Sequence, residues 1–330
     1  MKLLVIVFIL LFALSGAVTG QRQADTLKPD PKKAIDIIEH YGGFFFNPGS
    51  RVWNYYLEFS RALADKDLVD LTDNWNPATR CYALFALAEK HSPVVDSILQ
   101  AHLLDTALVF VLLGDDGDHK SVGDFFYGVL TDHFFKGVVQ LDSPEKAFVD
   151  SLIINRTGIR LEAKSDLLRN MPPKDAWYNR IREIATVENN NSAVVALSKY
   201  RKAQDLTLIE DLLKNPDRNV QYLGLLAARN YPDPALFPYI RQIHQIEIHR
   251  DGGFDYVQIR MLYQAIVQYK DSASRQLLLE TLKKAKSRTL EYHSEDIWGA
   301  LTRWPDPIYD NILSRLKIPV YAFPELSRTL

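Results

Sequence analysis

The chain of 330 residues contains a single cysteine, Cys81, and so can form no intrachain disulfide. A chain of this size does not need one, because a fold of about 300 residues buries roughly 75% of the surface that its unfolded chain exposes. Cys81 lies in the helical run Ala78–Leu84, where we expect a small core residue and not a nucleophile. The lack of disulfides favours a bacterial periplasm or outer surface over a eukaryotic extracellular space.

Long apolar runs are also missing, with one exception at the start of the sequence. Lys2 precedes twelve unbroken apolar residues, Leu3–Leu14, and mostly small residues follow as far as Gly20. One positive charge, a short apolar core and a small-residue exit are typical of a signal peptide, cleaved here after Ala17 or Gly20. A membrane-spanning helix needs about 20 apolar residues, so we expect no integral membrane span once residues 1–20 are removed. The sequence therefore predicts a secreted or periplasmic protein.

Neither sign of charge is in strong excess, since the formal net charge is -2 and the pI is near 6.5. Nucleic-acid-binding domains usually carry a basic surface, so we do not expect nucleic acid as a partner. The basic cluster Lys283–Arg288 closes a helical pattern, and the helix dipole favours cations at a helix C-terminus. We therefore interpret this cluster as a helix end.

Motifs of catalytic and metal sites are absent as well. The chain has no HExxH, CxxC or GxSxG motif and no glycine-rich phosphate loop. His244 and His249 are five residues apart, whereas a metal pair on one helix face needs a spacing of three or four. Asp115–Asp118 places carboxylates around a glycine, as calcium-binding loops do, but the bidentate glutamate of such a loop is missing. We therefore expect an acidic loop in which Asp118 caps the next helix. The sequence predicts no catalytic residue, no cofactor site and no metal site.

Strand patterns are the last feature that the sequence lacks. No alternating run of five or more residues is bounded by hairpin turns. From Lys32 onward the apolar residues recur mostly at helical spacing, and Val220–Ala227 shows this clearly, with its apolar positions three and four apart. The sequence therefore predicts an all-α protein.

An aromatic residue ends a helical run four times in the last third of the chain, and each time alanine stands four positions earlier. We call these aromatics the marker residues; they are 31, 38 and 35 residues apart, in the pairs Ala196/Tyr200, Ala227/Tyr231, Ala265/Tyr269 and Ala300/Trp304. A period of this size, with one helix before the marker and one after it, is typical of a solenoid built from helix pairs. We expect each alanine to be buried where two helices cross closely and only a methyl group fits.

Proline, together with aspartate or asparagine, marks the helix boundaries within each pair. Asp233-Pro234 and Asp306-Pro307 each place a capping side chain before a proline that suits the first turn of a second helix. Asn215-Pro216 has the same form and predicts the start of the first helix that follows it. Pro232 and Pro305 are expected to stop the first helices, because proline lacks the amide that the next turn requires.

A fifth copy lies upstream, where Asn76-Pro77 matches Asn215-Pro216 and begins a run rich in alanine and leucine that ends at Ala88. This unit, with its proline near the first helix, its Ala/Leu-rich stripe and its Asp or Asn in the turn, resembles a HEAT repeat, and so do the four C-terminal units. The resemblance covers residues 73–104 and 191–318. It implies an α-α superhelix of the armadillo-like type, a shape to which no reaction is attached.

Residues 105–190 interrupt the period and are either two diverged repeats, which we favour, or an inserted helical lobe. Helices are expected at Ser121–Gln140, Ser143–Asn155 and Trp177–Val187. The predicted organisation is a signal peptide (1–20), a polar tether (21–31), an N-terminal helical cap with the first HEAT-like unit (32–104), these irregular helices (105–190) and the C-terminal repeats (191–330).

Polar residues recur at fixed distances after the markers. The position eleven after each marker holds Asp211, Gln242, Glu280 and Arg315, and the position fourteen after it holds Lys214, Gln245, Lys283 and Ile318. If the second helices line the concave side, as in HEAT proteins, these positions form a polar ridge suited to a partner, although an ordinary solvated face is the competing interpretation. The leading hypothesis is a secreted, non-enzymatic scaffold that binds another protein through the ridge residues Gln242, Gln245, Glu280, Lys283 and Arg315.

Aromatic side chains concentrate in residues 41–59, which include Trp53, Tyr55 and Tyr56. Exposed rings could stack on sugars or anchor a partner, so a carbohydrate-active or carbohydrate-binding periplasmic protein is the alternative function. Large rings also fill the terminal cap that a solenoid needs, and this is the interpretation that we favour. Burial of these three rings would remove the support for the carbohydrate alternative.

Overall fold

The computed structural model describes residues 30–132, 135, 137–250 and 254–316. The expected signal peptide and residues 21–29 of the expected tether lie outside this part of the chain. Of the described residues, 67% are helical and 6% are in strands, so the protein is predominantly helical, as the sequence predicts. No helix in the described ranges combines the length and the apolar character that crossing a membrane requires.

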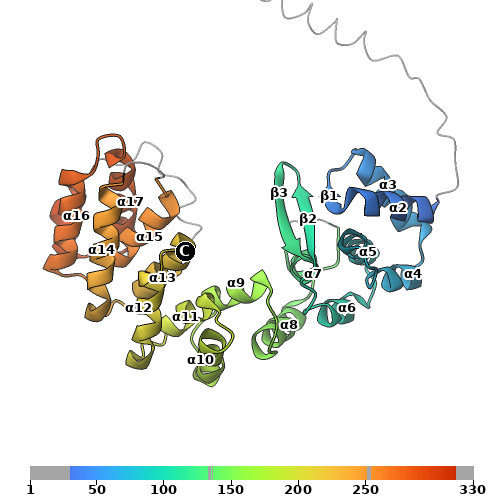
Figure 1. Cartoon of the computed structure of the whole chain (residues 1–330), viewed down its shortest axis with the longest axis horizontal. Helices are drawn as coiled ribbons and strands as arrows, with labels where there is room; N and C mark the ends of the chain where they lie inside the picture. The colour runs from blue at the N-terminus through green and yellow to red at the C-terminus, as the bar shows by residue number, and fades with distance from the viewer. Residues whose placement is uncertain (1–29, 133–134, 136, 251–253, 317–330) are drawn as a thin grey trace, which may run out of the picture. The chain divides into compact units, whose positions relative to one another are not determined.

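The chain divides into two compact units, and each is described by itself. Unit 1 extends to Leu87 and includes Val109–His119, whereas unit 2 comprises Ala88–Leu108 and the residues from Lys120 onward. The elements of unit 1, shown in Figure 1, are α2 (Pro31–Tyr41), β1 (Gly43–Phe46), α3 (Arg51–Ala62), α4 (Asp65–Leu71), most of α5 (Pro77–Glu89), β2 (Leu108–Leu113) and β3 (Asp116–Ser121).

A three-stranded sheet in the order β1-β2-β3 was not expected from the sequence. Strand β1 runs parallel to β2, with Gly43 opposite Phe110. Gly114 has φ +64 at the start of the two-residue turn between β2 and β3, where a tight hairpin of the II′ type requires a positive φ. Residues Asp116–Asp118, expected in a loop, therefore belong to a strand, and Asp118 does not cap the next helix. The hydroxyl of Ser121 does so, by accepting from the amide of Asp124.

Unit 2 contains the remaining helices. They are α6 (Val95–Ala101), α7 (Val122–Thr131), α8 (Ser143–Asn155), α9 (Glu162–Asn170), α10 (Tyr178–Thr186), α11 (Asn191–Ser198), α12 (Leu206–Lys214), α13 (Arg218–Asn230), α14 (Phe237–Ile248), α15 (Tyr256–Ile266), α16 (Ser272–Lys284), α17 (Leu290–Arg303) and α18 (Asp310–Leu313). Helix α8 has the expected bounds, and α7 is shorter than expected.

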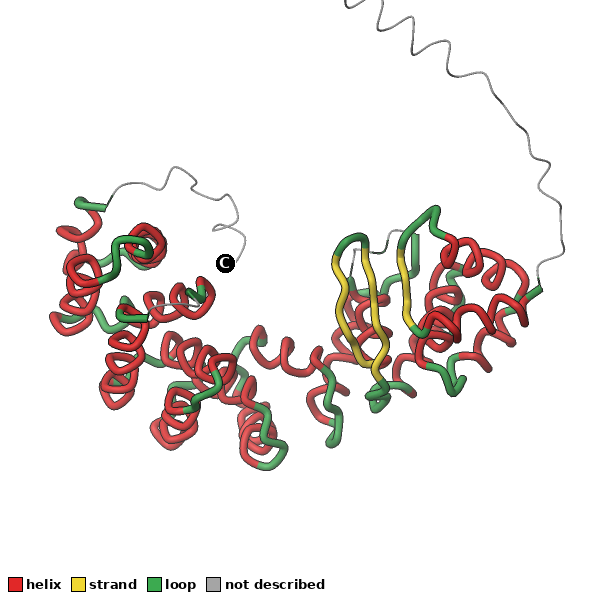
Figure 2. The backbone as a smooth tube through the Cα atoms, turned by 45° about the horizontal axis from the view of Figure 1, so that its top comes forward, coloured by secondary structure: helices red, strands yellow, loops and turns green. Residues whose placement is uncertain are grey.

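From α9 onward the helices form pairs, and a short 3-10 turn separates the two helices of most pairs. The first helices α9, α11, α13, α15 and α17 lie side by side in one row and pack closely on one another, whereas the second helices α12, α14 and α16 form a looser row. Figures 1 and 2 agree that this part of unit 2 curves, with the first helices on the inner side. Small residues in the first helices permit the close packing of the inner row.

The four predicted alanines are all buried, with exposed fractions between 0% and 2%: Ala196, Ala227, Ala265 and Ala300. A close approach of α13 to α12, the second helix of the preceding pair, occurs one turn earlier, at Gly224. A Cβ at that glycine would lie 2.8 Å from the backbone nitrogen of Leu213 in α12. The alanine pattern therefore marks buried positions correctly, and a glycine that the pattern did not use lets α13 pack closely on the second helix of the preceding pair.

Two of the four marker residues link successive helix pairs. The hydroxyl of Tyr200 bonds to both the amide nitrogen and the carbonyl oxygen of Lys174, at 3.0 and 2.8 Å, and the hydroxyl of Tyr269 donates to the carbonyl of Asp233 at 3.1 Å. Lys174 and Asp233 lie in the turn of the preceding helix pair. Each of these two markers thus ties the turn of one pair to the turn of the pair before it.

The helix boundaries follow the predicted capping residues with one correction. The side chains of Asp233 and Asp306 accept from backbone amides two residues later, and Asn76 caps α5 in the same way. Helix α13, however, begins at Arg218 with Asp217 as its cap, and Asn215 instead accepts from the amide of Asp217. The Asn215-Pro216 signal is therefore two residues early, because Asp217 offers a second capping carboxylate closer to the helix.

Candidate functional site

The aromatic segment of residues 41–59 contributes mainly to the core of unit 1. Phe44, Tyr56 and Phe59 are fully buried, and Trp53 is 8% exposed. The ring of Tyr56 stacks on Tyr82 of α5 with centroids 5.3 Å apart. The hydroxyl of Tyr82 in turn accepts from the backbone amide of Phe45 at 2.9 Å, and burial raises the pKa of Tyr82 well above its ordinary value. Trp53 and Tyr56 are therefore core residues, and their role in a terminal cap of the solenoid stays a prediction.

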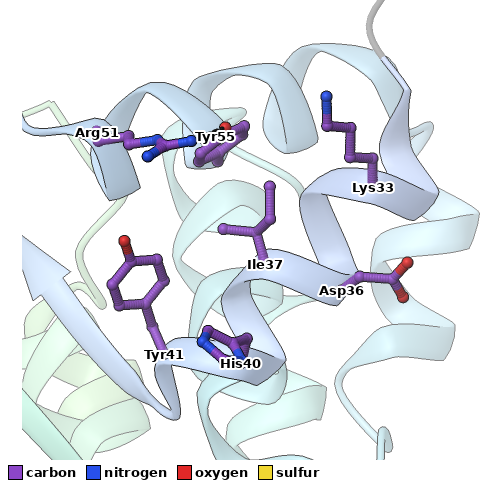
Figure 3. A pocket seen from close by; sticks show the side chains of 7 residues that line it. All are labelled: Lys33, Asp36, Ile37, His40, Tyr41, Arg51 and Tyr55. Carbon is purple, nitrogen blue, oxygen red and sulfur yellow. Dashed lines mark hydrogen bonds between the residues drawn. The ribbon is translucent and has the colours of Figure 1, made fainter.

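Two rings of the same segment, Tyr41 and Tyr55, do not enter the core. They line a cavity of about 420 Å³ between α2 and α3, together with Lys33, Asp36, Ile37, His40 and Arg51. Figure 3 shows Tyr41 and Arg51 at one end of this α2–α3 cavity and Lys33 and Asp36 at the other, with Ile37 and Tyr55 between them. Tyr41 is 46% exposed, so its ring is accessible.

The α2–α3 cavity carries charges that the fold does not neutralise. Within the described residues, Lys33, Asp36 and Arg51 form no ion pair. The guanidinium of Arg51 donates to the hydroxyl of Tyr55 at 3.4 Å and lies 5.8 Å from the centre of that ring. The hydrogen bond with Tyr55 raises the pKa of Arg51, so the guanidinium remains charged at any physiological pH.

Four of the ridge residues predicted from the sequence lie on the second helices α14 and α16, and Arg315 follows the end of α18. Gln242, Lys283 and Arg315 are exposed, and Gln245 of α14 donates to the carboxylate of Glu280 in α16 at 2.9 Å. The structure thus brings Gln245 and Glu280 together. The second helices are the outer row of the curve, whereas the ridge hypothesis assumed that they line its concave side. Whether these residues bind a partner remains a prediction.

The opposite surface is formed by the first helices. Gly224 of α13 faces α12, so Tyr222, Leu226 and Arg229, which share the other side of α13, point away from the second helices. The guanidinium of Arg229 donates to Gln264 of α15 at 2.7 Å, which places these two side chains on one surface. Val257 lies two turns before Gln264 on the same side of α15 and is 61% exposed. We call Tyr222, Leu226, Arg229, Val257 and Gln264 the first-helix face.

Arg229 is a half-buried cation to which no carboxylate is paired among the described residues. Its guanidinium lies 5.8 Å from the centre of the Trp304 ring, and that of Arg303 lies 4.6 Å from the same centre. Burial, and to a smaller extent the charge of Arg303, lowers the pKa of Arg229. Burial and the charge of Arg229 likewise lower the pKa of Lys199, whose ammonium donates to the carbonyls of Arg169 and Met171. The local field is therefore positive at this end of the first-helix face.

Helices α14 to α17 enclose a chain of buried polar side chains. His244 lies 2.7 Å from the hydroxyl of Thr281, and the hydroxyl of Tyr263 lies 2.7 Å from Nδ1 of His293 and donates to Thr281 at 3.4 Å. Burial lowers the pKa of each histidine to about 4, so both are neutral at pH 7. Nothing in the described part of the chain groups three or more His, Cys, Asp or Glu side chains as a metal site would require.

Sequence reasoning missed both the α2–α3 cavity and the first-helix face. Arg51 and Tyr55 are four residues apart, which is a helical spacing and could have indicated a shared surface. Tyr41 joins them only because the chain turns back at Gly42, which has φ +66. The sequence spacing of Arg229 and Gln264 gave no such signal, because they belong to different helix pairs.

Comparison with known proteins adds no relative. No family model matches the chain, and neither a curated protein nor a solved structure matches it.

Proposed function

We propose that the chain is a secreted or periplasmic scaffold, a HEAT-like helical-repeat solenoid that binds another protein and does not act as an enzyme. The observation that supports this proposal is the stacking of helix pairs from α9 to α17, in which the first helices form one continuous inner row. Such a stack offers an extended surface along several repeats, and surfaces of this kind hold partners.

The first-helix face is the surface on which we place the partner. Tyrosine and arginine are enriched among the residues that dominate binding energies, and this face carries Tyr222 and Arg229 beside the exposed Val257. Arg229 lacks a carboxylate partner in the described chain and lies near Arg303 and Lys199. A partner segment rich in Asp or Glu would supply the missing negative charge. The ridge residues on the outer row remain the competing surface.

The experiment compares three full-length proteins in capturing partners from extracts of the source organism. One is the parent, one carries Arg229→Gln with Val257→Ser, and one carries Gln242→Ala, Glu280→Ala and Arg315→Ala. We expect the first variant to lose at least about tenfold in affinity for a partner that the parent retains, and the ridge variant to bind as the parent does. Rising salt should weaken the parent's binding, because it screens the charges of Arg229 and its partner.

The reverse result, a loss of affinity for the partner in the ridge variant alone, would mean that the partner binds to the second helices. Retention of the partner by both variants would mean that neither surface binds it. The carbohydrate alternative is weaker than the sequence indicated, because Trp53 and Tyr56 are core residues. Of the aromatic segment, Tyr41 and Tyr55 line the α2–α3 cavity and remain available to a sugar.

A further inference from the structure

We propose that the α2–α3 cavity binds a small saccharide that carries a carboxylate, of the uronic-acid class. The site lies in unit 1 and uses none of the residues of the first-helix face, so it is independent of the proposed scaffold function. Its volume of about 420 Å³ is within the range of small-ligand sites, which is about 300–1,000 Å³.

The carboxylate of such a sugar is recognised at the end of the cavity where Arg51 lies. The guanidinium has five N–H donors in a planar fork that matches a carboxylate. Its one hydrogen bond in the described chain is the 3.4 Å contact with the Tyr55 hydroxyl, which leaves the other donors available. The guanidinium also lies 5.8 Å from the centre of the Tyr55 ring, so Arg51 stands beside the aromatic surface that would hold the sugar.

The pyranose ring of the sugar would pack on the apolar surface between the two charged ends of the cavity. A pyranose ring has a face of C–H groups, and such a face packs well on an aromatic ring. Tyr41, Tyr55 and the side chain of Ile37 provide this surface, and Tyr41 is 46% exposed. Tyrosine suits the position because it has an apolar ring and a hydroxyl that can bond to the sugar.

Asp36 distinguishes a sugar acid from other small carboxylates. A carboxylate side chain only accepts hydrogen bonds, so it favours a ligand with several hydroxyl donors. Asp36 forms no ion pair with another described residue and lies at the far end from Arg51, beside Lys33. Figure 3 shows the Asp36 carboxylate turned away from Ile37 and Tyr41, so it would accept only from a hydroxyl that extends past Lys33 at the rim of the cavity, and an aromatic carboxylate offers no such donor.

The test measures binding of glucuronate to the full-length protein by titration calorimetry and ligand-observed NMR. We compare the parent with Arg51→Met and with Arg61→Met, a matched control on the exposed side of the same helix that does not line the cavity. Charge-assisted hydrogen bonds contribute enough that Arg51→Met should weaken binding at least about tenfold, with Arg61→Met unchanged. Glucose and benzoate, titrated in parallel, should bind more weakly than glucuronate.

Three results would overturn the proposal. The first is that glucuronate shows no saturable binding to the parent at concentrations of about 10 mM, above the range expected for a useful small-ligand site. The second is that Arg51→Met binds glucuronate as the parent does. The third is that glucose or benzoate binds as tightly as glucuronate, which would remove the role of Arg51 or of Asp36. Because both variants change only exposed arginines, circular dichroism spectra equal to the parent's are expected for each.

Discussion

The aromatic core of unit 1 and the marker residues of unit 2 use their rings in different ways. In unit 1 the rings of Phe44, Trp53 and Tyr56 meet Tyr82 and Phe85 in one cluster, with neighbouring centroids 4.6–6.2 Å apart. In unit 2 the marker residues are distributed one to a helix pair, and two of them use a hydroxyl to reach the preceding pair. In a single cluster, the packing of each ring depends on all the other rings. In a stack of helix pairs, each pair is stabilised only by its contacts with the pairs before and after it. The comparison predicts that damage spreads in unit 1 and stays local in unit 2.

The largest effect is expected from Tyr56→Ala in unit 1. Tyr56 is fully buried and contacts the rings of Trp53, Tyr82 and Phe85, so the substitution should cost about 3–5 kcal/mol, as the loss of a large buried side chain usually does. Hydrogen exchange followed by mass spectrometry should show faster exchange across α3, α5 and β1 together. Glu58→Ala, at an exposed position of the same helix, is the control. Fast exchange confined to α3 would contradict the idea of one cooperative cluster.

The next effect is a pH dependence that arises in unit 2 from two buried histidines. The folded pKa of His244 and of His293 is about 4, below the ordinary value of 6.5. The unfolded chain therefore binds more protons than the folded chain between pH 6.5 and 4, and stability falls as the pH drops through this window. Each histidine accounts for at most about 3 kcal/mol. Asp296 opposes them, because burial raises its pKa from 3.8 to about 6, and its folded form gains a proton in the same window.

The measurement is the free energy of unfolding by urea at pH 6.5 and pH 4 for the parent and for His293→Asn. The variant should show a loss of stability on acidification that is smaller by about 2–3 kcal/mol, because one buried group no longer has to be protonated on unfolding. His249→Asn, which changes the exposed histidine directly after α14, is the control for the loss of a histidine outside the buried pair. Equal pH dependence in all three proteins would show that His293 is not held neutral in the folded state.

A smaller and more local effect is expected from Ala227→Leu in α13. Ala227 has no exposed surface, and three added heavy atoms should overpack its site at a cost of about 1–3 kcal/mol. Exchange should increase in α13 and its neighbours and stay unchanged in α17, because units of a stack contact only their neighbours. Ala235→Leu, at an exposed position, is the control. A melting temperature equal to the parent's would show that the site has room, and would contradict the close crossing.

The sequence predicted unit 2 better than unit 1, for physical reasons that particular residues show. Helix pairs repeat, so Ala227 and Tyr269 stand in a pattern that a single sequence displays. Strand β2 is a continuous apolar run, and β3 carries exposed charges such as Asp116, so neither shows the alternation that indicates a strand. The α2–α3 cavity depends on where Tyr41 lies after the turn at Gly42, which is a tertiary relation. The curvature of the stack also depends on packing, so the sequence could not assign the ridge to the outer row.

The smallest effect tests the marker residues themselves, through the hydroxyl of Tyr269. Tyr269→Phe keeps the ring and its edge contact with Phe237, whose centroid is 4.8 Å away, and removes only the hydrogen bond to the carbonyl of Asp233. The loss should be about 0.5–1.5 kcal/mol, the net value of one such bond. Tyr200→Phe removes two hydrogen bonds to the backbone of Lys174, but both lie near the surface, where water can replace the tyrosine hydroxyl, so the substitution should cost less. Urea unfolding of the two variants measures how much the marker hydroxyl contributes to stability. Equal and negligible losses in the free energy of unfolding would mean that the packing of the ring accounts for the recurrence of the markers, and that the hydrogen bond between turns does not.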